Sequence, residues 1–250
     1  MKRSKSSHKG QNGIVTVIAG SKEYSGAAYL AAKSIAVMRT GVDLVFVLCP
    51  EKVAYAINKL SPDLITVKLK GDYLNLKHYD LIKKYIKRSD VFLIGNGIAK
   101  QKQTKSLVKK IIKINKKKVI DADALKMIKI QDIDNAILTP HKAEFQALLK
   151  NSKLSKKNFR KYLKKNVILL KGSKDHIISK KKVKIIKGGN PGMTVGGTGD
   201  VLAGLCAGLA CYNNLFDAAV KASKLNKKIG DKLKKKLGFG FIASDFMKEI

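Results

Sequence analysis

Tryptophan is absent from this 250-residue sequence, and aromatic residues together make up only 6% of it. Cysteine is also scarce. The three cysteines, Cys49, Cys206 and Cys211, lie far apart or within apolar runs. An odd count without paired spacing favours reduced thiols, as in a cytoplasmic protein. The sequence contains no Cys/His cluster with zinc-ligand spacing and no Gly-x-Ser-x-Gly motif, so neither a zinc site nor a hydrolase nucleophile elbow is indicated.

Long apolar runs are lacking as well. No stretch approaches the roughly 20 apolar residues of a membrane-spanning helix. The basic start of the chain has no apolar signal core behind it, so we expect a cytoplasmic protein with no membrane partner. With 45% hydrophobic residues the chain can still bury a large core. In the absence of an evident linker or repeat, we expect one domain over residues 1–250, with a basic N-terminal arm over residues 1–12.

Acidic residues are few: 18 Asp and Glu stand against 52 Lys and Arg, which gives a formal net charge of +34. Only four of the basic residues are arginine, and lysines occur in every polar segment. A nucleic-acid-binding protein is expected to concentrate charge on one face and to favour arginine with interleaved aromatics. We therefore interpret the charge as a lysine-biased surface with no specific nucleic-acid partner. The alternative from another class is a nucleic-acid-binding protein whose affinity collapses with salt.

Short apolar runs alternate with helical segments along most of the chain. Residues 14–19 and 44–48 are predicted strands, and the small-residue helix over 26–38 joins them into a βαβ unit. Further strands are predicted at 64–69, 91–94, 119–120, 136–138 and 167–170, with a hairpin over 176–179 and 183–187. Further helices are predicted at 53–60, 78–87, 104–114, 145–149, 159–163, 215–236 and 242–250. This alternation predicts an α/β fold in which a mostly parallel sheet lies between two layers of helices.

A glycine-rich stretch, VGGTGDVLAGL over residues 195–205, leads into an apolar run that ends at 212. It indicates a loop that enters the first turn of a buried helix. The free N–H groups and the dipole at such a turn bind anions, so Gly197, Thr198 and Gly199 are a candidate anion hole. Asp200, at the mouth of this hole, is suited to taking a proton from a hydroxyl group during phosphoryl transfer. The alternative is a glycine-rich turn with a capping aspartate.

Other polar clusters follow predicted strands, at the edge where open α/β sheets bind ligands. Asp121 and Asp123 could hold Mg²⁺ through water, or Asp123 could cap a short helix. His141 and Glu144 could bind substrate and metal, or could form a helix cap. Residues 171–175, KGSKD, offer a flexible turn and cations for a nucleotide, or are simply a lysine-rich turn.

The segment NPGMTVGGTGDVLAG over residues 190–204 resembles the signature of ADP-dependent NAD(P)H-hydrate dehydratases, a family of ribokinase-like fold. Shorter matches occur in the same order, among them DADAL at 121–125, LTPH at 138–141 and LKG at 170–172. The resemblance covers nearly all of residues 8–250. Where the family usually has Gly-Pro-Gly-Leu-Gly, residues 95–99 are Gly-Asn-Gly-Ile-Ala. Where it usually has His-Pro-Gly-Glu, residues 141–144 are His-Lys-Ala-Glu. Many members carry an N-terminal epimerase domain, and none is expected here.

The resemblance implies a three-layer αβα sandwich that repairs damaged nicotinamide cofactor. The expected reaction converts hydrated NADH or NADPH to NAD(P)H, with ADP as co-substrate, Mg²⁺ as cofactor, and AMP and phosphate as products. Asp200 would deprotonate the ring hydroxyl, which would attack the terminal phosphoryl group. The alternative function is a kinase of the same fold that phosphorylates a vitamin precursor or another alcohol. A homo-oligomer, commonly a tetramer, is also implied.

Carried over position by position, the resemblance assigns residues to two ligands. Contacts to the hydrated dinucleotide are implied for Ala27, Gly97, His141 and Asp200. Contacts to ADP are implied for Lys171, Gly172, Ser173, Lys174, Asp175 and Gly199. For Ala27, plain packing of the helix on the sheet is the alternative. Metal ligands are left unassigned.

Overall fold

The computed structural model describes residues 4, 6–35 and 40–249. Within these residues the chain forms one nine-stranded sheet, in the order β3-β2-β1-β4-β5-β6-β7-β8-β9. The strands are β1 (Ile14–Ile18), β2 (Leu44–Pro50), β3 (Ile65–Leu69), β4 (Val91–Ile94), β5 (Lys117–Ile120), β6 (Ala136–Leu138), β7 (Val167–Leu170), β8 (Asp175–Ile178) and β9 (Val183–Ile186). Neighbours from β3 to β7 pair parallel, whereas β8 and β9 form the predicted antiparallel hairpin at one edge.

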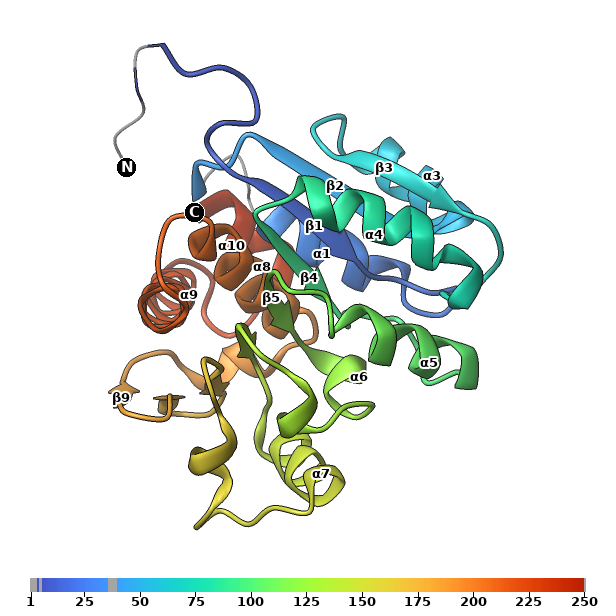
Figure 1. Cartoon of the computed structure of the whole chain (residues 1–250). Coiled ribbons are helices and arrows are strands. Elements are labelled where there is room, and N and C mark those ends of the chain that lie inside the picture. The colour runs from blue at the N-terminus through green and yellow to red at the C-terminus, as the bar shows by residue number, and fades with distance from the viewer. Residues whose placement is uncertain (1–3, 5, 36–39, 250) are drawn as a thin grey trace.

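Helices cover both faces of the sheet, as the alternating pattern predicts. They are α1 (Ser25–Ser34), α3 (Glu51–Leu60), α4 (Tyr79–Arg88), α5 (Lys102–Ile111), α6 (Ala122–Leu125), α7 (Lys142–Ser152), α8 (Thr198–Ala210), α9 (Leu215–Leu237) and α10 (Ala243–Glu249). One core contains side chains of α1, α3, α8, α9 and α10, and the other contains side chains of α4 to α7. In Figure 1, α4 lies in front of β1 and β4, and α1 lies behind them.

Each central strand contributes to both cores because successive side chains point to opposite faces of a sheet. In β4, Val91 and Leu93 pack with the first core, whereas Phe92 and Ile94 pack with the second. All four are fully buried. Continuous apolar runs are therefore the sequence signature of these strands, since neither face is open to water.

The strand order creates a switch point between β1 and β4. The chain runs outward from β1 to β3 and then returns to place β4 beside β1. Open α/β sheets bind ligands at such a point, beyond the carboxyl ends of the strands. Gly20 and Asn96 meet there, and the amide of Gly20 donates to the carbonyl of Asn96 at 2.8 Å.

Three of the predicted helices differ in detail from the structure or extend beyond the described residues. The helix predicted over residues 159–163 is present as a short 3₁₀ helix, Phe159–Tyr162. Lys164, two residues after this helix, has a left-handed conformation (φ 48°) that does not continue a right-handed helix. The helix predicted over 26–38 is described to Ser34, and the predicted residues 36–38 lie outside the described part. The short helix α6 exists, but Asp123 does not cap it, because Asp123 lies inside the helix and pairs with Lys126 at 3.2 Å.

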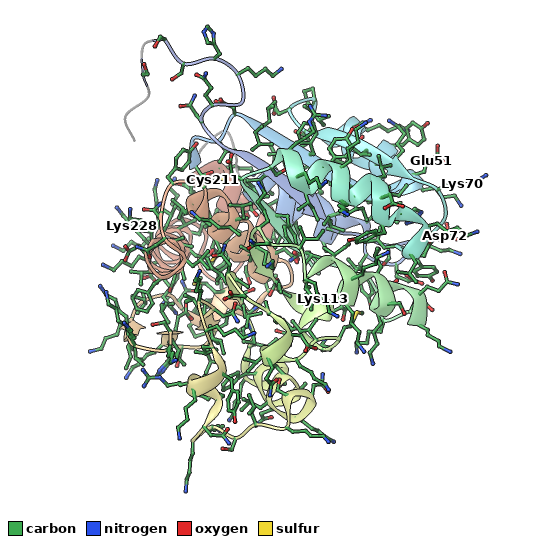
Figure 2. The ribbon with its side chains drawn as sticks, viewed as in Figure 1. Glu51, Lys70, Asp72, Lys113, Cys211 and Lys228 are labelled. Atoms are coloured by element: carbon green, nitrogen blue, oxygen red, sulfur yellow. The ribbon has the colours of Figure 1, made fainter. Side chains whose placement is uncertain are left out.

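The lysine excess is spread over the surface. Figure 2 shows nitrogen-tipped side chains around much of the outline of the molecule, with Lys70 and Lys228 near opposite edges of the view. This distribution agrees with a lysine-biased surface and differs from the single basic face expected of a nucleic-acid-binding protein. In the part of the chain that the structure describes, no helix combines the length and the apolar character needed to cross a membrane.

Candidate active site

The glycine-rich loop ends at Gly197, the N-cap of α8, which adopts a left-handed conformation (φ 93°). A Cβ at this position would lie 2.5 Å from Cδ1 of Leu30 and 2.9 Å from Cβ of Ala243, so both the backbone conformation and the available space require glycine. The hydroxyl of Thr198 donates to the carbonyls of Met193 (2.8 Å) and Val195 (3.0 Å). These bonds close the loop onto the start of the helix.

The predicted anion hole needs one correction. The amide of Thr198 lies 3.5 Å from the carbonyl of Val195 and is thus directed into the turn. The amides of Gly199 and Asp200 belong to the first turn of α8, where N–H groups have no partner within the helix. A Cβ at Gly199 would lie 3.3 Å from Nζ of Lys171, so a lysine ammonium stands beside this turn. The arrangement suits a phosphoryl group between the helix terminus and the cation.

Asp200 belongs to a network of polar and charged side chains at the ends of β4, β5, β6 and β7. The amide nitrogen of Asn96 donates to Oδ1 of Asp200 at 2.6 Å and to Oδ2 of Asp121 at 2.9 Å. Oδ1 of Asp121 accepts from the hydroxyl of Thr139 (2.7 Å) and from Nζ of Lys171 (3.0 Å). Both oxygens of Asp121 are therefore occupied by protein donors.

The network bears on the predicted Mg²⁺ site at Asp121 and Asp123. Asp121 is occupied as described, and Asp123 pairs with Lys126. Among the described residues there is no group of three or more His, Cys, Asp or Glu side chains that could hold a metal ion. The protein part of this site thus offers no preformed cage for a cation.

The environment of Asp200 suits a general base. Burial is the main cause that raises the pKa of this carboxyl to about 7, and the negative charges of Asp121 and Glu144 act in the same direction. The hydrogen bond from Asn96 and the charge of Lys171 oppose the rise. A carboxyl that titrates near neutral pH can take and return a proton under physiological conditions.

His141 and Glu144 form the capping arrangement at the start of α7. Nδ1 of His141 accepts from the amides of Ala143 (3.1 Å) and Glu144 (3.4 Å), and Oε2 of Glu144 accepts from the amide of His141 at 3.0 Å. The capping alternative is confirmed by these bonds. His141 also lines a cavity; its side chain is 54% exposed, and its Nε2 lies 3.4 Å from Oε1 of Glu144.

That cavity, of about 590 Å³, lies between the 171–175 turn, the glycine-rich loop and α9. Its volume falls in the range of small-molecule sites. It is lined by several predicted nucleotide contacts, namely Lys171, Gly172, Ser173, Asp175 and Gly199. Lys174 is exposed and does not line the cavity. Asp175 is buried, and its two oxygens accept from the amide of Gly172 (3.0 Å) and from the hydroxyl of Ser223 (2.7 Å), so it shapes the turn.

Lys227 is a residue of the candidate site that sequence reasoning missed. It is buried on α9, and its Nζ donates to the carbonyls of Gly172 and Ser173, each at 3.1 Å. The same atom lies 3.5 Å from Oδ1 of Asp175. Lys227 thereby holds the turn that lines the cavity. In a helix with so many lysines, the sequence contains no signal that distinguishes this one.

Ala27 and Gly97 lie together beside the end of β4. Gly97 has φ 65°, and a Cβ there would lie 2.7 Å from Cβ of Tyr24 and 2.8 Å from Cβ of Ala27. Both residues are half-buried. The structure thus brings these two predicted substrate contacts next to each other. Asn96 directly precedes Gly97, and sequence reasoning noted it only as a departure from the family pattern.

Residues 15–250 match the family model described as NAD(P)H-hydrate dehydratase. The chain is 38% identical over 258 residues to a bifunctional NAD(P)H-hydrate repair enzyme of Methanothermobacter thermautotrophicus, covering 96% of this chain and 49% of that protein. It is 34% identical over 261 residues to an ADP-dependent (S)-NAD(P)H-hydrate dehydratase of Nitrosopumilus maritimus, covering 99% and 90%. The ADP/ATP-dependent NAD(P)H-hydrate dehydratase of Bacillus subtilis, co-crystallised with ATP and Mg²⁺, aligns with a TM-score of 0.79 at 23% identity, covering 99% and 92%.

The last likeness bears on the fold alone, and it confirms the predicted ribokinase-like arrangement. The chain spans about half the length of the bifunctional relatives that it matches. The matching family model does not favour the alternative of a small-molecule kinase. From the extent of that match and the identity to the Nitrosopumilus protein, the chain belongs to the NAD(P)H-hydrate dehydratase family.

Proposed function

We propose that this protein dehydrates hydrated NADH or NADPH and uses ADP as the phosphoryl donor. In this scheme the ring hydroxyl of the hydrate takes the terminal phosphoryl group of ADP, and AMP leaves. Elimination of phosphate then restores the dihydropyridine ring. The products are NAD(P)H, AMP and phosphate. The observation that carries the proposal is the position of Asp200, whose pKa is raised to about 7 at the glycine-rich entry of α8.

Asp200 is the proposed base. An ionised Asp200 accepts the proton of the ring hydroxyl, and the resulting oxygen attacks the phosphoryl group. The free first-turn amide of Gly199 and the ammonium of Lys171 stabilise the charge that develops on the phosphoryl oxygens. Preorganised donors of this kind act without reorganisation at the moment of reaction.

The cavity beside the 171–175 turn is the proposed nucleotide site. Lys227 and Asp175 fix the main chain of this turn, so its shape is set before a ligand binds. The dinucleotide is proposed to lie on the other side of Asp200, against Ala27 and Gly97, with His141 at the rim. The small side chain of Ala27 and the absence of a side chain at Gly97 let the two residues lie close together and leave room for the reacting ring.

Magnesium is proposed to enter with the nucleotide. Mg²⁺ usually keeps several waters and binds substrate phosphates with few protein ligands. That habit fits a site whose described residues include no group of three or more ligating side chains. Magnesium would neutralise charge on the phosphate oxygens, while the steps above are carried by Asp200 and the amides of α8.

The direct test incubates the protein with hydrated NADH, Mg²⁺ and either ADP or ATP, and quantifies the nucleotide products. The proposal expects AMP and phosphate in equal amounts with restored NADH when ADP is supplied. The name of the Nitrosopumilus relative supports ADP, whereas that of the Bacillus enzyme includes ATP. A stable phosphorylated dinucleotide without free phosphate would contradict the dehydration.

A further inference from the structure

One amide nitrogen joins two carboxylates in this site. Nδ2 of Asn96 donates to Asp200 at 2.6 Å and to Asp121 at 2.9 Å. The three residues come from the end of β4, the end of β5 and the first turn of α8, and Asn96 is separated from its partners by 104 and 25 positions in the sequence. The side chain of Asn96 therefore connects segments that only the fold brings together.

The carboxylates fix the orientation of this amide. Its nitrogen is its only donor end, and the reverse orientation would place the carbonyl oxygen against two acceptors. Asn96 is fully buried, and within the described residues its Oδ1 has no hydrogen-bond partner. A buried acceptor without a partner, such as Oδ1, is unfavourable. The asparagine at this position is therefore explained by the hydrogen bonds that its Nδ2 donates.

The backbone on either side holds Asn96 in place. Gly95 has φ 129°, and a Cβ there would lie 1.9 Å from the carbonyl oxygen of Asp121, so the two strand ends approach closely. Gly97 is also left-handed, and the carbonyl of Asn96 accepts from the amide of Gly20 across the switch point. The amide of Asn96 is thus presented to Asp200 by a constrained loop.

We propose that Asn96 is a positioning residue for Asp200: it fixes the orientation of the carboxylate and favours its ionised form beside the second carboxylate, Asp121. This inference rests on the proposed role of Asp200 as base. Two carboxylates that share a site disfavour each other's charge, and a donor shared between them offsets that repulsion.

Groups from several elements face Asp200. Asp121 at the end of β5 and Glu144 on α7 disfavour its charge, whereas Lys171 after β7 favours it. From α1, the hydroxyl of Ser34 donates to the main-chain carbonyl of Asp200 and does not titrate. In this set Asn96 is the neutral donor to the carboxylate of Asp200, and its removal leaves the repulsion from Asp121 unopposed on that side.

The test compares Asn96→Leu and Asn96→Ala with a matched control, Asn166→Ala. Asn166 is also buried and hydrogen-bonded, but to the main chain at Ile133 and Ala136. In the Asn96 variants, we expect the fall of kcat/KM at low pH to occur about one pH unit higher than in the wild type. At pH values below this acid limb, kcat/KM should therefore be about tenfold lower than in the wild type. The control should keep the wild-type limb even if it is less stable. A folded Asn96 variant with an unshifted limb would overturn the inference.

A second readout needs no turnover. Carboxyl ¹³C NMR of the ligand-free protein follows the titration of Asp200, whose resonance is identified by its loss in Asp200→Asn. The midpoint should rise in the Asn96 variants and stay unchanged in Asn166→Ala. If the wild type lacks dehydratase activity, the proposed function fails, but this titration still tests the bridge.

The side-chain amide resonances of Asn96 extend the test to the wild type, in case neither variant folds. They should shift with the same midpoint as the carboxyl of Asp200 and should lose that shift in Asp200→Asn. Asn96 resonances that do not respond to the titration would overturn the inference.

Discussion

Nζ of Lys171 lies 3.0 Å from Oδ1 of Asp121, and this ion pair joins the end of β7 to the end of β5. The same ammonium lies 4.0 Å from Oε2 of Glu144. Burial opposes the charge of Lys171, but the two carboxylates outweigh it and raise the pKa of this lysine. Lys171 is therefore a permanent cation at neutral pH, placed between acidic groups and the first turn of α8.

Replacing Lys171 with methionine should damage both stability and activity. The change leaves three carboxylates near one another without their cation, and breaking a buried ion pair by removing one partner costs about 3–5 kcal/mol. We also expect KM for the nucleotide to rise at least about tenfold, since a charge-assisted contact to phosphate is lost. Chemical denaturation and initial rates measure these effects.

Lys181→Met is the control for Lys171→Met, because Lys181 is exposed on the β8–β9 turn. It should leave the denaturation midpoint and the KM for nucleotide near those of the wild type. Equal effects of the two substitutions would show that general surface charge, and not the position of Lys171, attracts the nucleotide.

The raised pKa of Asp200 predicts a pH-dependent stability. Between its ordinary value of 3.8 and about 7, the folded protein holds a proton on Asp200 that the unfolded chain has released. The free energy of unfolding should therefore fall as pH rises from about 3.8 to about 7 and should level off above 7. Asp200→Asn removes this titration, so the variant should gain stability relative to the wild type by about 2 kcal/mol between mildly acidic and mildly alkaline buffer.

Urea denaturation of wild type and Asp200→Asn at several pH values measures that difference. The difference in free energy of unfolding between the two proteins should change with pH, since a difference that stays constant would come from packing alone. A difference in free energy of unfolding that does not depend on pH would contradict the raised pKa of Asp200.

Gly204 on α8 should resist substitution although it lies inside a helix. Alanine is intrinsically better in a helix than glycine by about 1 kcal/mol. A Cβ at Gly204, however, would lie 2.5 Å from the carbonyl of Ala31 and 2.4 Å from Oγ of Ser34 on α1. We expect Gly204→Ala to destabilise the protein by about 2 kcal/mol, because backbone atoms of α1 must shift.

Gly26→Ala, in the same pair of helices, should change the stability in the opposite direction from Gly204→Ala. Gly26 lies in the first turn of α1, and a Cβ there would meet no heavy atom within 4 Å. Thermal or chemical denaturation should show a gain of about 0.5–1 kcal/mol. If both alanine variants stabilise the protein, the close contact between α1 and α8 is looser than described.

Lys227→Met should release the 171–175 turn. The substitution removes donors to the carbonyls of Gly172 and Ser173 and leaves Asp175 without its cation. We expect KM for the nucleotide to rise by about tenfold, with a smaller effect on KM for the dinucleotide. The neighbouring Lys228 is exposed (Figure 2), and Lys228→Met should change neither constant. A Lys227 variant with wild-type KM values would remove this residue from the nucleotide site.

Much of the fold could be predicted because its causes are local. The apolar run of β4 and the small-residue helix α1 follow from burial on both faces and from close packing. The position of Asp200 at a helix start follows from the three glycines around Thr198. A helix at residues 159–163 could be predicted, but not its 3₁₀ type or its end before the left-handed Lys164.

The contacts within the site could not be derived from sequence spacing. Asn96, Asp121 and Asp200 meet because their strands and helix end at one edge of the sheet, and no local pattern encodes the shared amide. The capping role of His141 was foreseen as an alternative because its partners lie within three residues. Lys227 was missed because burial, which distinguishes it from the other lysines of α9, depends on tertiary packing.

The most direct measurement follows the reduced-nicotinamide absorbance band after hydrated NADH, Mg²⁺ and ADP are mixed with wild type or Asp200→Asn. Wild type should restore the band, whereas the variant should be slower by about 100- to 10,000-fold, the range expected for loss of a general base, while it still binds ADP. Recovery of the band at the wild-type rate by Asp200→Asn would contradict the assignment of Asp200 as the base.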